Sequence, residues 1–359
     1  MNKSLSLYLD AIRLAAALVV FVGHLSSSQF TGGLGWQAAG YMGDAVTAFF
    51  VLSGFLIAHA TRREVDARSY AVARLARLAS VALPALALTF ALDAVGRTIN
   101  PTLYATLGGY AWDGRAWQAG VSLLFANQWW WLDTAAGSDL PYWSMSFEAA
   151  YYVLFGLVLF AQRAWRWAAV AAVLLIVGPQ IAVLLPVWLL GVLAYRCCGR
   201  IGPWAGAALC IGTLAAAVIL DAVLHRHALP FASDWLPRRP MVLRDYLFGT
   251  LFALHLIGAA ALAPALPAIP RQIGIGIQWA AGGSFTLYLL HYPVAMVLAA
   301  MLPWPAASWP ARAVMFGGTL LAVMAVASVT ERRKDAWRRK VAWLLREPGA
   351  HWMAPSPSR

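Results

Sequence analysis

The sequence has few charged residues and few cysteines, and each shortage excludes a class of protein. Only 12% of the 359 residues are charged, whereas a soluble globular domain carries about 25%. The three cysteines, Cys197, Cys198 and Cys210, have neither the spacing of a metal site nor an oxidising context, so we interpret them as packing residues. No small-residue cleavage site follows the first apolar run, and we therefore expect no removable signal peptide.

Apolar residues make up 61% of the chain and gather in long runs. A transmembrane helix needs about 20 such residues, and outer-membrane barrels lack runs of this kind. We therefore predict an all-α, polytopic membrane bundle of about 10 transmembrane helices. The expected spans are residues 8–28, 41–60, 78–95, 143–161, 167–180, 181–195, 203–222, 246–264, 280–301 and 311–330.

The 27 basic residues indicate how the chain is oriented. With the N-terminus placed inside, most of them fall in the segments that face the cytoplasm, as the positive-inside rule expects. Both termini are then cytoplasmic. The net charge of +12 is explained by topology, and we expect no nucleic-acid partner.

Two stretches outside the predicted spans have a character of their own. The outer stretch 96–142 contains VSLLFANQWWW, which is too short to cross the membrane and is expected to be re-entrant or interfacial. The sequence ERRKDAWRRKVAWLLR, from Glu331, predicts a basic amphipathic helix on the inner leaflet. We therefore divide the chain into a transmembrane domain, 1–335, and a cytoplasmic tail, 336–359.

The first span, LDAIRLAAALVVFVGHL, carries three polar residues: Asp10, Arg13 and His24. Arg13 and His24 lie about 20° apart around a helix and about 16 Å apart along it, so they share a face without touching. Asp10 is within ion-pair reach of Arg13. A charge at the membrane centre costs about 2.5–3.5 kcal/mol on insertion scales, so such residues often mark a site. Simple neutralisation of Arg13 by Asp10 is the alternative.

Three further segments carry polar residues that need an explanation. Arg74 and Arg77, in YAVARLARL, can grip phosphate or simply anchor the chain at the inner surface. Glu148, in YWSMSFEAAYYVLF, needs a buried partner, for which Arg13 or His24 is the candidate. Ser53 and Gly54, in FFVLSGFLIA, are expected to permit close helix packing. A second polar stripe lies on one helical face of GGSFTLYLLHYP, at Ser284, Tyr288 and His291.

Taken in order, these segments resemble the motifs of the acyltransferase family 3 membrane proteins. The resemblance is carried by LDAIRLAAALVVFVGH, FFVLSGFLIA, YAVARLARL, YWSMSFEAAYY, LPVWLLGVLAYR and GGSFTLYLLHYPV, over about residues 5–335. Two departures are Ala149 and Ala150, where the family often has an acidic residue and a glutamine, and the lack of a proline after Glu331.

The resemblance implies transfer of an acyl group, usually acetyl, from cytoplasmic acyl-CoA to a hydroxyl of an extracytoplasmic or lipid-linked carbohydrate in the bacterial inner (plasma) membrane. It implies that Arg74 and Arg77 bind the phosphates of acetyl-CoA, and that Arg13, held by Asp10, lines the path. His24 is then the general base or a transient acyl carrier, and Glu148 orients it or completes the charge balance. The substrate-binding candidates are Trp143, Ser146, Tyr288 and His291. No metal is expected.

Two other functions fit the polar stripes. A secondary transporter of a sugar or lipid-linked sugar would also place charged residues along one helical face, but no inverted repeat is visible. A non-catalytic subunit of an envelope-assembly complex would use the stripes only to hold its helices together.

Overall fold

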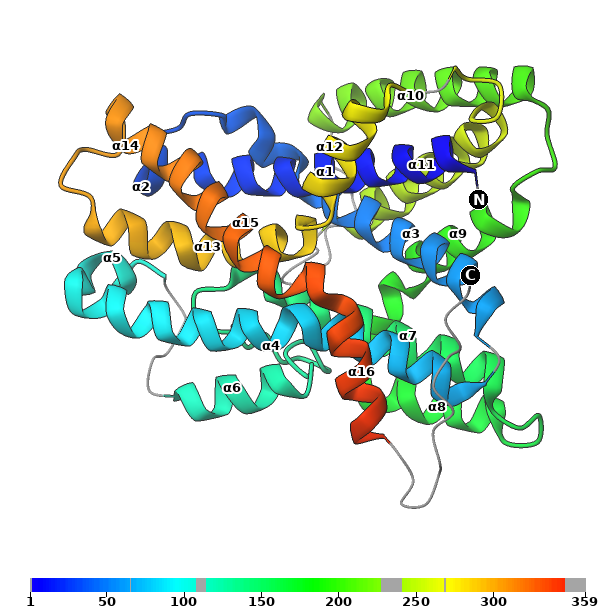
Figure 1. Cartoon of the computed structure of the whole chain (residues 1–359), viewed down its shortest axis with the longest axis horizontal. Helices are drawn as coiled ribbons and strands as arrows, with labels where there is room; N and C mark the ends of the chain where they lie inside the picture. The colour runs from blue at the N-terminus through cyan, green and yellow to red at the C-terminus, as the bar shows by residue number, and fades with distance from the viewer. Residues whose placement is uncertain (1, 65, 108–113, 227–240, 268, 346–359) are drawn as a thin grey trace.

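The chain folds into a helical bundle (Figure 1). The computed structural model describes residues 2–64, 66–107, 114–226, 241–267 and 269–345. Within these ranges the secondary structure is helical, without any named strand, as predicted. The principal helices are α1 (Lys3–Leu25), α3 (Met42–Ala60), α4 (Ala67–Ile99), α7 (Ser144–Phe160), α8 (Arg166–Val177), α9 (Pro179–Cys197), α10 (Pro203–Arg226), α11 (Val242–Leu262), α13 (Ser284–Met301) and α15 (Thr319–Val329).

Nine helical segments of the described residues are long and apolar enough to cross a membrane. The expected polytopic bundle is therefore confirmed. The other helices are short: α2 (Ser28–Thr31), α5 (Pro101–Ala105), α6 (Arg115–Leu123), α12 (Arg271–Ala281), α14 (Trp309–Ala313) and α16 (Lys334–Leu344). In Figure 1, α2, α5 and α14 gather at one end of the bundle.

Helix α8 replaces the span predicted at 167–180, and its 12 residues are too few to cross the bilayer alone. At about 1.5 Å per residue it covers roughly 18 Å of a hydrocarbon core of about 30 Å. Trp130, from the stretch 96–142, binds the C-terminal end of α8. It donates its backbone N–H to the carbonyl of Val177 at 2.9 Å and its indole N–H to the carbonyl of Leu175 at 2.9 Å. The tryptophan-rich stretch thus packs against the end of a short helix.

Buried hydrogen bonds to Asp93, here called the Asp93 clamp, fix the end of the stretch 96–142 to α4. The carboxylate of Asp93 accepts hydrogen bonds from both the backbone N–H of Ser138, at 2.8 Å, and its hydroxyl. Gly137, at φ 59°, lets the chain turn closely over that carboxylate. Burial and the neighbouring Asp93 raise the pKa of Asp139 well above its ordinary value. The Asp93 clamp sets the position from which α7 begins.

The most enclosed spans are α3 and α13, and they form the centre of the bundle. Helix α13 packs against α1, α4 and α15, while α3 packs against α1, α9 and α11. A Cβ at Gly54 of α3 or at Gly191 of α9 would overlap the facing backbone, so only glycine permits this approach. The interpretation of Gly54 as a close-packing residue therefore agrees with the structure.

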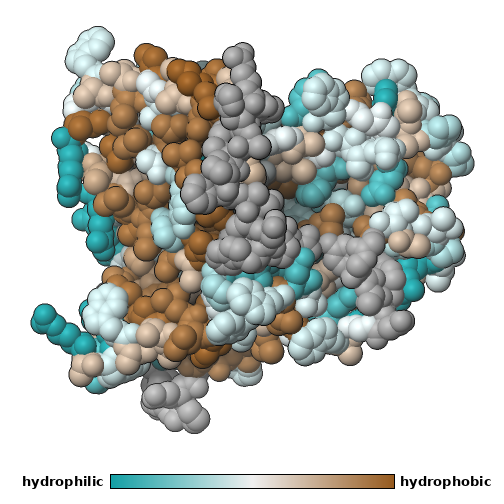
Figure 2. Space-filling view, turned by 180° about the vertical axis from the view of Figure 1, so that it is seen from behind, coloured by the Kyte–Doolittle hydropathy of each residue, from teal (hydrophilic) through white to brown (hydrophobic). Residues whose placement is uncertain are grey.

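The outer surface of the bundle suits a lipid environment. Figure 2 shows broad hydrophobic areas on one side of the molecule. Helix α10 is the least buried of the candidate spans, and its large apolar side chains are exposed at Ile211, Leu214, Val218 and Ile219. Apolar exposure on this scale is not stable in water, whereas in a bilayer it is solvated by acyl chains.

Candidate active site

Two contacts, one within α1 and one with α12, hold the side chain of Arg13 in place. Its Nη2 atom donates to Oδ1 of Asp10 at 3.2 Å and to the carbonyl oxygen of Ala281 at 2.9 Å. Ala281 is the last residue of α12, so the guanidinium also satisfies an open carbonyl at a helix end. The ion pair expected within the first span is present, and it fixes Arg13 beside the junction of α12 and α13.

Glu148 has different partners from those the sequence suggested. Its Oε1 atom accepts hydrogen bonds from the hydroxyl of Ser53, at 3.2 Å, and from that of Tyr152, and it lies 3.8 Å from Nε of Arg77. The interpretation that Arg13 or His24 would pair with it is therefore wrong. The reason is that α4 begins at Ala67 rather than near 78, which carries Arg77 into the bundle beside α7.

The Glu148 cluster extends across five helices, α3, α4, α7, α9 and α13. Arg77 donates from Nε to the Tyr152 hydroxyl at 3.2 Å, and its guanidinium lies 5.2 Å from the ring centre of Phe285. On the other side, the indole of Trp188 donates to the hydroxyl of Ser53 at 3.3 Å. Ser53 therefore does more than allow close packing, because its hydroxyl links α9 to the carboxylate of Glu148.

A basic cavity of about 490 Å³ lies where α4, α13 and α16 meet. Arg74 lines it while paired with Glu64, and its guanidinium lies 5.4 Å from the ring centre of Tyr70. Among the described residues, six cations and two carboxylates line the cavity, so an anion is the complementary ligand. These charged residues are Arg13, Arg74, Arg77, Arg332, Lys334 and Arg338, with Glu331 and Asp335.

A narrow cavity of about 50 Å³ adjoins the basic cavity. Both are lined by Arg13, Arg77 and Phe285, which therefore form the wall that the two cavities share. The narrow cavity has aromatic and aliphatic walls with a few polar groups. Those walls and groups are Val46, Phe49, Phe50, Leu52, Ser53, Leu56, Ser144, Glu148, Ser284 and Tyr288.

The other substrate-binding candidates differ in their relation to this cavity. Tyr288 lines it and donates its hydroxyl to Ser144 at 3.0 Å. Trp143 packs edge-on against Phe147, beside the cavity rather than in its wall. Ser146 is fully buried, and its hydroxyl has no partner among the described residues. Because it is two positions from Ser144, it points to the opposite side of α7.

His24 and His291 lie together between α1 and α13. Their ring centres are 5.3 Å apart, and the ring of Tyr292 lies 5.3 Å from that of His24. Nδ1 of His291 is 2.8 Å from the carbonyl oxygen of Leu287, so Nδ1 donates and Nε2 carries the lone pair. That Nε2 is buried without a partner in the described part of the chain. Neither histidine is among the residues that line the two cavities.

Glu331 lines the basic cavity, although sequence reasoning treated it only as the start of a basic amphipathic helix. Its Oε2 atom accepts hydrogen bonds from the backbone N–H and the hydroxyl of Thr286, both at 2.9 Å. It therefore ties the end of the last span to the first turn of α13, in the wall of the basic cavity. A signal was available, because Glu331 is the first acidic residue after an apolar span and precedes a run of cations.

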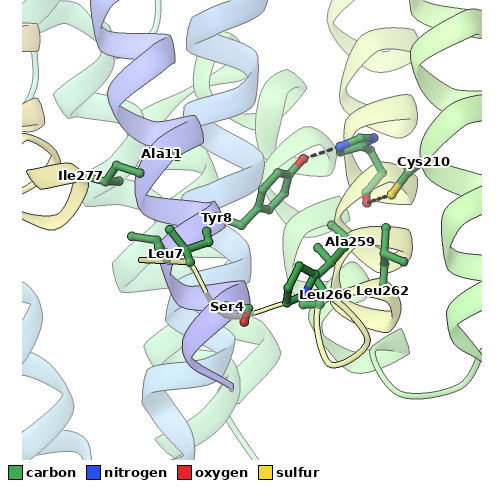
Figure 3. A pocket seen from close by; sticks show the side chains of 13 residues that line it. Ser4, Leu7, Tyr8, Ala11, Cys210, Ala259, Leu262, Leu266 and Ile277 are labelled. Carbon is green, nitrogen blue, oxygen red and sulfur yellow. Dashed lines mark hydrogen bonds between the residues drawn. The ribbon is translucent and has the colours of Figure 1, made fainter. Parts of the chain in front are cut away.

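A second large cavity, of about 480 Å³, lies on the opposite face of α1 (Figure 3). Its walls are mostly apolar and come from α1, α11 and α12, with Leu7 and Ala11 on the α1 side. The Tyr8 hydroxyl points across to Nε2 of His255, whose Nδ1 lies 3.1 Å from the hydroxyl of Thr213. These polar groups satisfy one another, so the cavity offers no charged site.

Comparison with known proteins agrees with these features. The model of the acyltransferase 3 family, described as an acyltransferase domain, matches residues 6–328. The chain belongs to the acyltransferase 3 family. Its nine membrane-length helical segments among the described residues agree with a multi-pass membrane protein, and membership of the family favours group transfer over the transporter and scaffold alternatives.

A curated relative of this chain is "Acyltransferase MdmB" from Streptomyces mycarofaciens. The two are 32% identical over 157 residues, which cover 42% of this chain and 38% of the relative. The match thus spans well under two thirds of the relative's length. No solved structure matches the chain. Among the described residues, no group of three or more His, Cys, Asp or Glu side chains could hold a metal ion.

Proposed function

We propose that this acyltransferase moves an acetyl group from cytoplasmic acetyl-CoA to a hydroxyl of an extracytoplasmic or lipid-linked carbohydrate in the bacterial inner membrane. The observation that carries the proposal is the shared wall of the two cavities. Arg13, Arg77 and Phe285 line both a basic cavity, suited to phosphates, and a narrow and mostly apolar cavity, suited to an acyl group.

The basic cavity has the charge that the phosphate groups of an acyl-CoA require, and the volume of a small-molecule site. Its volume of about 490 Å³ lies within the range of small-molecule sites, about 300–1,000 Å³. Guanidinium groups bind phosphate oxygens through paired N–H donors, and three of the cavity's arginines come from helices α1 and α4. Arg74 and Arg77 are assigned to the donor, with the cavity on the cytoplasmic side and both termini cytoplasmic.

The narrow cavity supports a short acyl group. A water molecule needs about 10–15 Å³ of such volume, so 50 Å³ holds roughly four water-sized groups. Acetyl has three heavy atoms beyond the sulfur, whereas each longer homologue adds one. Leu56 and Phe49 are among the apolar residues that line the space, so the fit favours a short acyl group such as acetyl.

His24 is assigned as the general base. It removes the proton from the acceptor hydroxyl while the oxygen attacks the thioester carbonyl; the C–S bond breaks, and the thiolate of CoA takes up the proton. A base in this position typically contributes about 10²–10⁴-fold to the rate. Transient acylation of His24, followed by transfer to the hydroxyl, is the alternative course.

The geometry changes the assignment of Glu148. Because its carboxylate contacts Ser53, Tyr152 and Arg77, it positions Arg77 rather than the imidazole of His24. Tyr288, in the narrow cavity, precedes His291 by less than one helical turn. The hydrogen bond from Tyr288 to Ser144 therefore lies between the narrow cavity and the turn of α13 that carries His291.

Transfer from labelled donor tests the proposed function. Membranes that contain the protein are incubated with acetyl-CoA labelled in the acetyl group, and the label in glycan and glycolipid fractions is counted. We expect labelling above that of membranes without the protein, together with an acetyl-sized mass difference on surface glycan. Labelling that does not depend on the protein would contradict the proposal.

A further inference from the structure

Helix α16, expected as a helix on the membrane surface, packs against α4. Val341 forms a small apolar cluster with Val72 and Ala76 of α4, and Trp337 packs on the same cluster. In Figure 1, α16 crosses α4 at the side of the bundle. The contact lies beside the basic cavity, which Ala73 and Ala76 of α4 also line.

The face of α16 that meets α4 also carries two cations. Relative to Lys334, Arg338 lies about 40° and Val341 about −20° around the helix, so the three share one face. Lys334 and Arg338 both line the basic cavity. The packing of Val341 therefore directs this pair of cations toward the cavity.

These two cations differ from the deeper arginines because no hydrogen bond or close ion pair holds them, although Lys334 interacts electrostatically with Asp10. Arg13 is held by Asp10, Arg77 by Glu148 and Tyr152, and Arg74 by Glu64. Arg332 donates to the carbonyl of Trp279 at 2.9 Å. Lys334 and Arg338 make no hydrogen bond or ion pair with any residue that the structure describes.

We propose that Lys334 and Arg338 of α16 form the subsite that binds the phosphate groups at the nucleotide end of the acyl donor. This inference rests on the proposed function. When the thioester lies at the shared wall formed by Arg13 and Arg77, the pantetheine arm places the nucleotide phosphates away from it, at the rim. The rim is the part of the cavity that α16 supplies.

Asp335 makes the subsite adjustable. Its carboxylate lines the same cavity as the two cations and weakens their field. Removing that negative charge strengthens phosphate binding, because like charges within a Debye length, about 8–10 Å at ordinary ionic strength, repel. Asp335→Asn is therefore a change that improves donor binding, which loss of folding cannot imitate.

The experiment measures donor binding to purified protein in lipid nanodiscs, which needs no acceptor. The double variant Lys334→Gln with Arg338→Gln is compared with Arg333→Gln with Arg339→Gln. The control pair removes the same charge from exposed residues that do not line the cavity. The ligands are CoA, 3′-dephospho-CoA and pantetheine, which carry progressively fewer phosphates.

We expect the Kd for CoA to rise about tenfold in the cavity pair and less than twofold in the control pair. The increase becomes smaller with 3′-dephospho-CoA, disappears with pantetheine and shrinks at high salt, while Asp335→Asn lowers the Kd for CoA. Equal effects of the two pairs, or an equal loss with pantetheine, would overturn the subsite. Failure of the proposed function is distinct, because it appears as absence of acetyl transfer in the unaltered protein.

Discussion

Helix α1 separates two cavities of nearly equal volume, about 490 and 480 Å³, whose chemistry is opposite. Arg13 lies in the wall of the basic cavity, whereas Leu7, Tyr8 and Ala11 face the apolar one. In the apolar cavity the polar groups bind each other, from Tyr8 through His255 to Thr213. In the basic cavity, cations outnumber carboxylates. The two cavities therefore differ in charge rather than in volume, and the charge is what identifies the proposed donor site.

The largest expected effect separates two histidines that lie on opposite sides of α1. His24→Ala removes the general base, so acetyl transfer falls by about 10²–10⁴-fold while insertion and abundance stay unchanged. His255→Phe, beside the apolar cavity, keeps transfer within about threefold. Labelling of glycan by membranes, at matched protein amounts, measures both. Near-normal transfer by His24→Ala would remove this residue from the mechanism.

A second prediction concerns the half-buried pair of Arg77 and Glu148. Arg77→Met leaves the carboxylate without its cation, which costs about 1–3 kcal/mol, and transfer is lost together with part of the stability. Adding Glu148→Gln restores most of the stability, because no unpaired charge remains, but it does not restore transfer. Thermal unfolding in detergent and acetyl labelling measure the two quantities. A double variant as unstable as Arg77→Met would contradict the assigned pairing.

A third prediction changes the preference for the acyl chain. Leu56→Ala enlarges the narrow cavity, and we expect the ratio of butyryl to acetyl transfer to rise about tenfold, within the 1–3 kcal/mol that a methylene can contribute. Leu262→Ala removes the same atoms from the wall of the apolar cavity and leaves that ratio unchanged. Competition between the two acyl-CoA donors gives the ratio directly. An equal shift in both variants would show that the narrow cavity does not hold the acyl group.

The smallest effect is expected from filling the apolar cavity. Ala259→Leu adds apolar atoms to a wall without charged residues, so thermal stability rises by about 0.5–2 kcal/mol and acetyl transfer stays within twofold. Unfolding in detergent and labelling by membranes check the two parts. A large loss of transfer without loss of stability would give the apolar cavity a role in the reaction.

Much of the fold followed from composition and from local spacing. Apolar runs predicted the helical bundle, and the positions of Asp10 and Arg13, three residues apart, predicted their ion pair, because one helix contains both. The partner of Glu148 was not predictable, because it depends on how deeply α4 enters beside α7. For the same reason the sequence did not show that Glu331 binds Thr286, or that α16 lies against α4.

Hydropathy also led to one segment being predicted as a full membrane span, although its helix is too short to cross the bilayer. The predicted segment 167–180 is apolar enough, yet α8 ends at Val177, and Trp130 from the outer segment meets its end. The local pair Gly178-Pro179 ends the helix, because Gly178 takes a φ of 83° and Pro179 begins α9, and Trp130 packs against this turn. The cavities could not be predicted, since each is formed where side chains from at least three helices leave space.

The central claim is that the donor occupies the basic cavity on one side of α1 and leaves the apolar cavity empty. Its most direct test uses a variant without Cys197, Cys198 and Cys210, into which Ala73→Cys or Ala11→Cys is introduced. Each cysteine is labelled with a small maleimide, with and without acetyl-CoA. We predict that acetyl-CoA slows labelling at position 73 and leaves position 11 unaffected. Protection at position 11, or none at position 73, would contradict the claim.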